Sequence, residues 1–389
     1  MKKIATVLVF LGICVASAAQ KFDYNVTFDY IFANYEYDAS GDFYHDSYTL
    51  HAARLTPEAG LLIRQNKSVY HRLRLGADFL HEMGDGANGL TQFKELLYYY
   101  NIEARLPNGG TLVANAGCFP RKYLDGSSYR GPFFDDDILY KDSNLEGVLI
   151  KYSRSKRIRA ELALDWMGMK GDAMSPYRRE RFQILTDGTW RFAGDFSLGW
   201  TGSFYHYACA PEFPNVVDNH MLYPRLEWRP FTWLDACTLS AGGIFSYQWD
   251  RSADPGPFFP MGLYLEQLAG KWGVSLHNRF YWGDDLMPLF NSSYGGMEYG
   301  TSMYFGDPAF RTQVIHPSWS DWLSLRYEPR IAKFLRLGGE LTVQFGDNSR
   351  YRGTHFRGWQ QTVRLVVDLD PLRPHPSAQG RRGKREITL

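Results

Sequence analysis

Two short motifs place a histidine two residues before a serine, a spacing that could bring a base to a nucleophile. They are His45-Asp46-Ser47 and His316-Pro317-Ser318. A hydrolytic serine also needs its histidine oriented by a third group, and the sequence offers no way to choose one. The sequence contains no glycine-rich phosphate loop and no His-Glu-x-x-His metal motif. We therefore expect a protein that is not an enzyme and that carries no cofactor.

A long polar segment, Phe119 to Asn144, carries charges of both signs. Its basic pair is Arg121 and Lys122, and its acidic cluster is Asp135-Asp136-Asp137. A segment of this length without regular structure is usually functional or disordered. Folded inward, it would place opposed charges inside the protein, and left outside it would be a solvated loop. The acidic cluster could also bind a divalent cation through its oxygens, but we assign no metal site to it.

Charged residues elsewhere recur at every second position, which is the period of a β-strand. In the run from Val69 to Phe79, Arg72 and Arg74 share one face while Leu73 and Leu75 take the other. Such a run has one wet wall and one apolar wall. The positions of this kind that are candidates to line a pore are Arg72, Arg74, Arg157, Arg159, Glu161, Arg279, Arg336 and Glu340. The charges of the long segment, Arg121, Lys122, Asp135, Asp136 and Asp137, are candidates for a constriction.

Several of the alternating runs reach about ten residues or more, the length that a tilted strand needs to cross a bilayer. Ordinary strands average about five or six residues. Aromatic residues cluster at run ends, as in Leu97 to Tyr100 and Phe204 to Tyr207, where a girdle would meet lipid headgroups. Short and long connections alternate, which is typical of short periplasmic turns and long extracellular loops. The predicted fold is all-β, a transmembrane antiparallel up-and-down barrel.

The number of strands must be even if the chain is to return to the side on which it started. Strands are expected near residues 22–37, 47–65, 69–82, 92–105, 110–118, 145–153, 157–168, 180–192, 195–207, 218–229, 236–249, 258–268, 271–282, 319–328, 334–345 and 358–370. This pattern predicts about 16 strands. Met297 to Phe305 also resembles a strand, so the region from Gly283 to Ser318 holds either no spanning strand or two, and 18 is the alternative.

The first residues predict export. Two lysines precede an apolar stretch, Ile4 to Val15, and Ala16 to Ala19 supply the small residues that a signal peptidase requires. No later run is apolar for long enough to form a transmembrane helix. We expect a cleaved signal peptide at residues 1–19, a barrel at 20–370 and a flexible, basic periplasmic tail at 371–389.

The composition excludes one class of partner. The chain of 389 residues has 43 Lys and Arg against 42 Asp and Glu, a net charge of +1. Nucleic acid is therefore not expected as a partner, because its recognition requires a basic surplus or stripe. After the predicted signal peptide, Cys118, Cys209 and Cys237 are widely spaced and fit neither a disulfide framework nor a zinc site. A single disulfide bridge between two of them is an alternative that we do not predict.

Three segments carry a resemblance to a known family: Gly117 to Arg121, Asn144 to Ile150 and Glu161 to Gly168. They resemble segments of porin-like outer-membrane β-barrels of the bacteroidete type, and the likeness spans most of the chain after the predicted signal. The resemblance implies a monomeric or homotrimeric pore or uptake channel in the cell outer membrane, surrounded by lipid and inserted by the barrel-assembly machinery. Many such barrels end on an aromatic residue, whereas this chain continues past Asp370, so an insertion signal would be internal, at Leu365 to Leu369.

The predicted function is a channel for passive or substrate-selective diffusion of small hydrophilic solutes. Opposed charges in the lumen would select solutes by charge and size. Aromatic residues in the lumen phase, such as Tyr205 and Tyr281, would suit stacking of a sugar. An alternative is a plugged barrel that acts as a surface receptor, an adhesin or a structural outer-membrane protein. A soluble exported β-sandwich is a third possibility.

Overall fold

The computed structural model describes residues 19–37, 47–84, 92–126, 129–155, 157–168, 180–208, 216–251, 256–287, 306–307, 310, 317–329, 331–347 and 355–370, with the backbone alone at 19, 20 and 136–138. The predicted signal peptide up to residue 18 and the predicted tail at 371–389 lie outside this range. Of the cysteines after the signal, Cys118 is buried, Cys237 is half-buried and both are free thiols, whereas Cys209 lies outside the described residues.

The described chain forms sixteen strands and two short helices. They are β1 (Ala19–Tyr37), β2 (Tyr48–Arg64), β3 (Val69–Glu82), β4 (Gln92–Arg105), β5 (Gly110–Pro120), η1 (Arg121–Tyr123), α2 (Asp136–Lys141), β6 (Asn144–Arg154), β7 (Ile158–Gly168), β8 (Arg181–Ala193), β9 (Phe196–Tyr207), β10 (Val217–Trp228), β11 (Ala236–Asp250), β12 (Met261–Lys271), β13 (Val274–Gly283), β14 (Ser318–Tyr327), β15 (Leu335–Gly346) and β16 (Phe356–Asp368).

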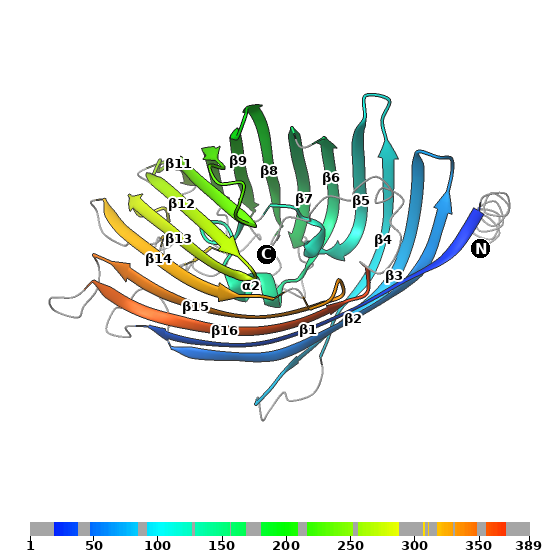
Figure 1. Ribbon diagram of the computed structural model, residues 1–389, viewed down its shortest axis with the longest axis horizontal. Coiled ribbons are helices and arrows are strands. Elements are labelled where there is room, and N and C mark those ends of the chain that lie inside the picture. Colours follow the sequence, from blue (N-terminus) through cyan, green and yellow to red (C-terminus); the bar gives the residue numbers. More distant parts are fainter. Residues whose placement is uncertain are drawn as a thin grey trace.

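Each strand pairs antiparallel with its neighbours along the chain, and β1 pairs with β16, so the sheet closes into a barrel (Figure 1). Strands β13 and β14 pair directly, from Val274 opposite Tyr327 to Gly283 opposite Ser318, which leaves no place for two further strands between them. The count of 16 is therefore confirmed, and the alternative of 18 is wrong. The proposed extra strand at Met297 to Phe305 lies outside the described residues.

Connections of two lengths alternate around the barrel, as the sequence predicted. The turns that join β2 to β3, β4 to β5, β6 to β7, β8 to β9 and β12 to β13 are short, and they lie at the same end as the beginning of β1. The connections at the opposite end are longer, and only the one between β5 and β6 is described nearly throughout. It contains η1 and α2.

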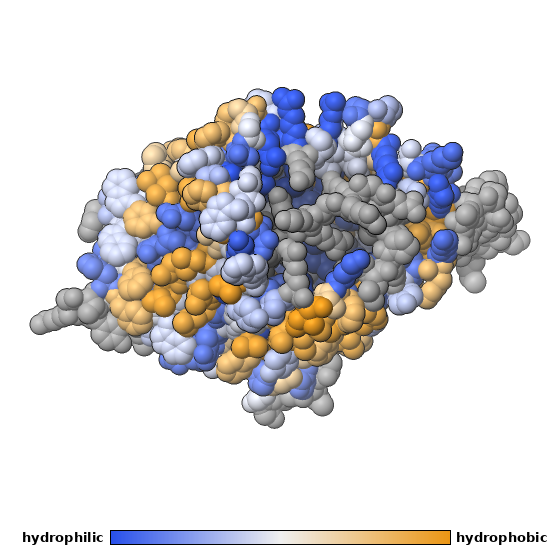
Figure 2. Space-filling model, viewed as in Figure 1, coloured by the Kyte–Doolittle hydropathy of each residue, from blue (hydrophilic) through white to orange (hydrophobic). Residues whose placement is uncertain are grey.

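Burial alternates along the strands because successive side chains point to opposite faces of the sheet. In β3, Arg74 is 2% exposed, whereas its neighbours Leu73 and Leu75 are 53% and 61% exposed. The outer wall therefore carries apolar side chains and the inner wall carries charges. Figure 2 shows hydrophobic side chains gathered over β14 to β16 and over β1 and β2.

Part of the interior is packed with apolar side chains. A buried cluster joins inward-facing residues of ten strands, β4 to β8 and β10 to β14, to aromatic residues of the connection between β5 and β6, Phe133 and Phe134 among them. Tyr281 is fully buried in this cluster, its ring 5.1 Å from that of Phe310 and its hydroxyl donating to the Asp284 carbonyl at 2.6 Å. Tyr205 is also buried. Neither ring is available to stack on a sugar, so that expectation is wrong.

Candidate functional site

The connection between β5 and β6 folds into the barrel. Figure 1 shows this segment, with α2, inside the ring of strands. Its described side chains contact inward-facing residues of β1, β2, β3, β7, β15 and β16, as the following contacts establish. Of the three arrangements that the sequence left open, the inward fold is the one that the structure has.

Arg121 joins the two ends of this segment to the barrel wall. Its Nη2 lies 2.7 Å from Asp165 Oδ2 of β7 and 2.7 Å from Asp142 Oδ2, and its Nε donates to the Asp142 carbonyl at 2.8 Å. Its guanidinium also lies over the ring of Phe134, 5.6 Å from the centroid. Burial alone would lower the pKa of Arg121, but the carboxylates of Asp165 and Asp142 outweigh it and raise the pKa. The guanidinium therefore stays charged while it is buried.

Arg74 is the centre of a second group of contacts, at the tip of η1. Its Nε lies 2.6 Å from Asp23 Oδ2 and its Nη2 lies 2.9 Å from Asp370 Oδ1. Its Nη1 donates to the hydroxyls of Tyr99 at 3.2 Å and Tyr123 at 3.0 Å. Burial, the nearby Tyr99 and the Glu58 carboxylate raise the pKa of Tyr123, which therefore remains a neutral phenol. Through Tyr123, the segment is attached to the charged inner wall.

Lys122 extends these contacts to the seam where the barrel closes. Its Nζ donates to Thr27 Oγ1 of β1 at 2.8 Å and lies 3.4 Å from Asp368 Oδ2 of β16. The exposed fraction of its side chain is 29%. Lys122 thus bridges the first strand and the last.

Arg54 of β2 holds the other end of the segment. Its guanidinium donates to the Asp78 carboxylate, to Ser143 Oγ at 2.6 Å and to the carbonyls of Tyr140 and Lys141 at the end of α2. Asn144 donates to the same Asp78 carboxylate at 2.8 Å. The Arg54 guanidinium lies at the carbonyl end of this short helix, where the backbone dipoles favour a positive charge.

Charged residues of β6 and β7 hold the middle of the segment. The carboxylate of Glu161 accepts the backbone N–H groups of Asp125 at 2.7 Å and Gly126 at 3.1 Å. Lys151 donates to the Tyr123 carbonyl and to Asp125 Oδ1, both at 2.7 Å. Next to this pair, Arg159 forms an ion pair with the fully buried Asp187. The segment is therefore held from both sides of the lumen.

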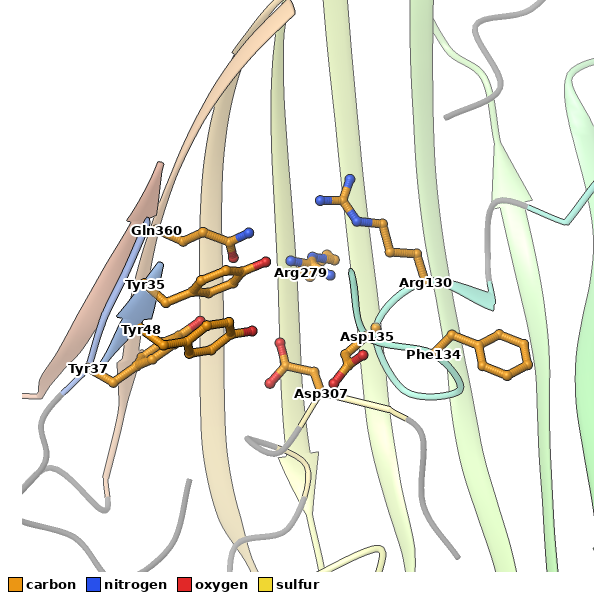
Figure 3. Close-up of a pocket in the computed structure, with 10 residues that line it drawn as sticks. Tyr35, Tyr37, Tyr48, Arg130, Phe134, Asp135, Arg279, Asp307 and Gln360 are labelled. Atoms are coloured by element: carbon orange, nitrogen blue, oxygen red, sulfur yellow. The ribbon is translucent and has the colours of Figure 1, made fainter. Parts of the chain in front are cut away.

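A cleft with aromatic and charged walls lies beside this segment (Figure 3). On one side are three tyrosines and a glutamine, and on the other are Arg279 and residues of the segment. The lining residues are Tyr35, Tyr37, Tyr48, Arg130, Gly131, Phe134, Asp135, Arg279, Asp307 and Gln360. Tyr35 and Tyr48 stack with their ring centroids 4.4 Å apart.

The candidate residues divide into three groups by location. Arg74, Arg121, Lys122, Arg159 and Glu161 take part in the contacts described above, and Arg72 donates to Asn101 Oδ1 at 3.3 Å. Asp135 and Arg279 line the cleft, and Glu340 lies 3.4 Å from both Arg130 Nη2 and Arg326 Nη2. Arg157 and Arg336 are exposed at the short-turn end of the barrel.

The acidic cluster and the histidine motifs are only partly visible. The side chains of Asp136 and Asp137, and the whole of His45 and His316, lie outside the described residues. Within the described part of the chain, no three potential metal-ligating side chains come together. No helix there is both long enough and apolar enough to cross a membrane.

Sequence reasoning missed several inward-facing residues, among them Asp23, Glu58 and Arg225. The sequence pattern could have identified Asp23. This residue alternates with Phe22 and Tyr24 in the same way as Arg74 alternates with the leucines of β3. Tyr35 and Tyr37 of the cleft occupy the same alternate positions of β1 as Asp23. Asp370 follows the last strand, and no pattern marks it.

No protein-family model matches the chain, and no curated protein matches it in sequence. Several solved structures are similar to it. They include OccAB3 of Acinetobacter baumannii (10% identity, TM-score 0.44), an anion-selective porin from Comamonas acidovorans (13%, 0.49) and a loop L8 deletion mutant of OmpT, an outer membrane protein of Vibrio cholerae (11%, 0.49). Each comparison covers 90% of this chain and 99% of the other. The identities and TM-scores are too low for this likeness to carry a statement about the function of this chain.

Proposed function

We propose that this protein is a narrow outer-membrane channel for small hydrophilic solutes. The observation that carries the proposal is the division of the barrel wall into an apolar outer face and a charged inner face. Leucines such as Leu73, Leu75 and Leu162 are more than half exposed on the outer wall. A continuous apolar outer surface of this kind needs lipid to cover it, because in water each such side chain would forfeit its transfer free energy.

An aromatic belt at the short-turn end supports the same placement. Exposed rings gather where the strands β8 to β14 meet their turns, and they include Trp190, Phe196, Trp228, Trp233, Trp272 and Tyr327. Lys271 Nζ lies 5.0 Å from the ring centroid of Trp233 and 4.8 Å from that of Trp272. Tryptophan and lysine side chains of this kind favour the boundary between lipid and water, where one end is apolar and the other is wet.

The segment between β5 and β6 supports a narrow passage rather than a wide one. Charges of both signs hold it in the lumen: Arg54, Arg74 and Arg121 pair with acids of the wall or of the segment itself, and the Glu161 carboxylate accepts backbone N–H groups. A solute that passes such a constriction meets fixed charges of both signs at close range, and these select by charge and size.

Packing of the interior favours one competing function. Phe119, Phe133, Phe134 and Leu145 are almost fully buried inside the barrel, so the segment behaves partly as a plug. A fully plugged barrel would act as a surface receptor, an adhesin or a structural protein. Charged contacts around the segment, rather than a uniformly apolar core, make the channel the preferred function.

The finer expectations from the sequence belong to the same proposal. They are export through a cleaved signal peptide, insertion by the barrel-assembly machinery, a monomeric or homotrimeric state, and kinship with the bacteroidete type of porin-like barrel. The basic C-terminal tail would then lie in the periplasm.

Planar-bilayer conductance of the refolded protein tests the proposal. The expected result is steady unitary steps, with a reversal potential across a salt gradient that reports the dominant lumen charge. Folding is verified beforehand by the shift in gel mobility between unheated and boiled samples. Silence from a barrel that passes this check would contradict the channel and favour the plugged alternative.

A further inference from the structure

A second cleft opens at the short-turn end of the barrel, between the turn that joins β6 to β7 and the turn that joins β8 to β9. Strands β7 and β8 pair, which places the two turns side by side (Figure 1). The cleft has a volume of about 430 Å³. The described residues that line it are Ser155, Arg157, Arg191, Phe192, Ala193 and Gly194, which include two arginines and no acid.

Backbone contacts hold the two arginines next to each other. The Arg191 N–H donates to the Arg157 carbonyl at 2.8 Å, where β8 runs beside the beginning of β7. The Arg157 N–H donates in turn to the Arg154 carbonyl at 3.2 Å and to Ser155 Oγ at 3.3 Å, which fixes the turn. Two guanidinium groups therefore share one cleft because the fold places their backbones there.

The neighbouring acids do not pair with these two arginines. Asp187 of β8 forms its ion pair with Arg159. Asp195, in the turn after Gly194, is exposed, and within the described part of the chain it forms no ion pair with either arginine of the cleft. Arg191 Nε is buried and has no hydrogen-bond partner among the described residues. A bound anion would satisfy this donor.

A row of aromatic rings begins at the same cleft and crosses the outer wall from β8 to β10. Its members, Trp190, Phe192, Phe196 and Trp228, are each 40% to 44% exposed. Their ring centroids follow one another at 6.0, 6.5 and 5.8 Å, and the last pair is stacked with 5° between the planes. Phe192 belongs both to the row and to the cleft. An apolar surface thus lies directly beside two cations, which matches a ligand with a hydrocarbon part and an anionic part.

We propose that the cleft and the aromatic row bind an anionic phospholipid, with its phosphate between Arg157 and Arg191 and its acyl chains along the rings. Guanidinium groups and phosphate oxygens form paired, charge-assisted hydrogen bonds. Basic residues at a membrane surface attract lipids with a net negative headgroup, so two cations in one cleft favour such a lipid over a zwitterionic one. The inference goes beyond the proposed channel, because it concerns the outer rim and rests only on the placement of the barrel in a membrane.

Native mass spectrometry of the refolded protein in detergent tests the assignment. The probes are phosphatidylglycerol, phosphatidylethanolamine with the same acyl chains, and glycerol phosphate. Phosphatidylglycerol is expected to bind about tenfold more tightly than phosphatidylethanolamine, because the ammonium group of the latter opposes the two arginines. Glycerol phosphate carries the anion without the chains and should bind more weakly than phosphatidylglycerol.

Variants of the cleft separate a defined site from the general charge of the rim. In the double variant Arg157→Gln/Arg191→Gln, binding of phosphatidylglycerol should weaken by about tenfold. The matched control is Lys67→Gln/Lys333→Gln, which removes two exposed cations from other turns at the same end of the barrel. It should change the affinity by less than about twofold, since exposed charges away from the ligand contribute little. Phe192→Ser keeps both arginines and should weaken binding by about fivefold through loss of apolar contact.

Several results would overturn the assignment. Equal binding of the two phospholipids would exclude recognition of the net charge, and equal losses in the two double variants would leave only a diffuse attraction to the rim. Glycerol phosphate that binds as tightly as phosphatidylglycerol would identify a site for a soluble phosphate instead. Unchanged binding in Phe192→Ser would remove the aromatic row from the site. Lipid binding in detergent needs no conduction, so a protein that conducts without selecting phosphatidylglycerol overturns this inference alone, and one that selects it without conducting overturns the channel alone.

Discussion

Arg74 of β3 and Asp370, two residues beyond the end of β16, form an ion pair with 2.9 Å between Nη2 and Oδ1. In the closed barrel, β1 and β2 lie between these elements. The same guanidinium reaches Asp23 of β1 at 2.6 Å and Glu58 of β2 at 3.6 Å. One cation therefore connects three consecutive strands to the segment that follows the last strand, across the seam where the barrel closes.

Replacement of Arg74 by methionine should destabilise the barrel strongly. The carboxylates of Asp23 and Glu58 would stay buried without the Arg74 guanidinium, and breaking a buried ion pair in this way costs about 3–5 kcal/mol. The measurement is the midpoint of urea unfolding in lipid vesicles, followed by tryptophan fluorescence. Arg336→Met removes an exposed arginine from β15 and is the control, with little change expected. Equal midpoints for the two variants would contradict the role given to Arg74.

The alternation of charges made the wall of this barrel predictable. A period of two assigns Arg74 and Asp78 to one face without any knowledge of their partners, and the structure has both buried on the inner face. Parity and turn lengths then give about sixteen strands, and the direct pairing of β13 with β14 excludes the alternative of eighteen. These features are local, so a single sequence contains them.

The contacts inside the barrel could not be predicted in the same way. Arg74 and Asp370 are 296 positions apart, and only closure of the sheet brings them together. The segment from 119 to 144 has a composition that suits water, metal or lumen equally well, and its direction depends on partners such as Asp165 and Arg54 on other strands. The alternating pattern places Arg157 and Arg336 in the lumen, whereas the structure has them exposed at the rim. Strand ends are the part of an alternating pattern that a sequence defines least well.

Release of Arg121 from the wall should widen the passage. Asp165→Asn removes the carboxylate on β7, which leaves Arg121 with the half-exposed Asp142 alone. An incompletely satisfied buried donor costs about 1–3 kcal/mol, which favours excursions of the segment. Single-channel recordings should therefore show larger and noisier steps than the parent. Asp142→Asn is the control and should change the steps less, and identical recordings for all three proteins would rule out a constricting role for the segment.

The outer wall should tolerate charge at the rim but not in the middle. Leu75 is an exposed residue near the centre of β3, whereas Trp272 lies in the turn between β12 and β13. Arginine at a lipid-facing position costs about 2–4 kcal/mol at the bilayer midplane and about 0–1 kcal/mol near the interface. Leu75→Arg should thus reduce the free energy of unfolding from vesicles far more than Trp272→Arg does. Similar losses from both variants would show that lipid does not cover the wall at Leu75.

One glycine of the wall should be irreplaceable where β6 meets β7. Gly147 has φ of +155°, and a Cβ atom there would lie 2.1 Å from the Leu164 carbonyl oxygen of the neighbouring strand. Gly147→Ala therefore forces the backbones of β6 and β7 apart, next to the Asp165 carboxylate that holds Arg121. We expect a lower unfolding midpoint in urea together with larger conductance steps. Gly339→Ala is the matched control on β15, because the nearest atom to its Cβ would be 3.8 Å away. If both alanine variants unfold at the same midpoint as the parent, the close contact between β6 and β7 does not constrain the barrel.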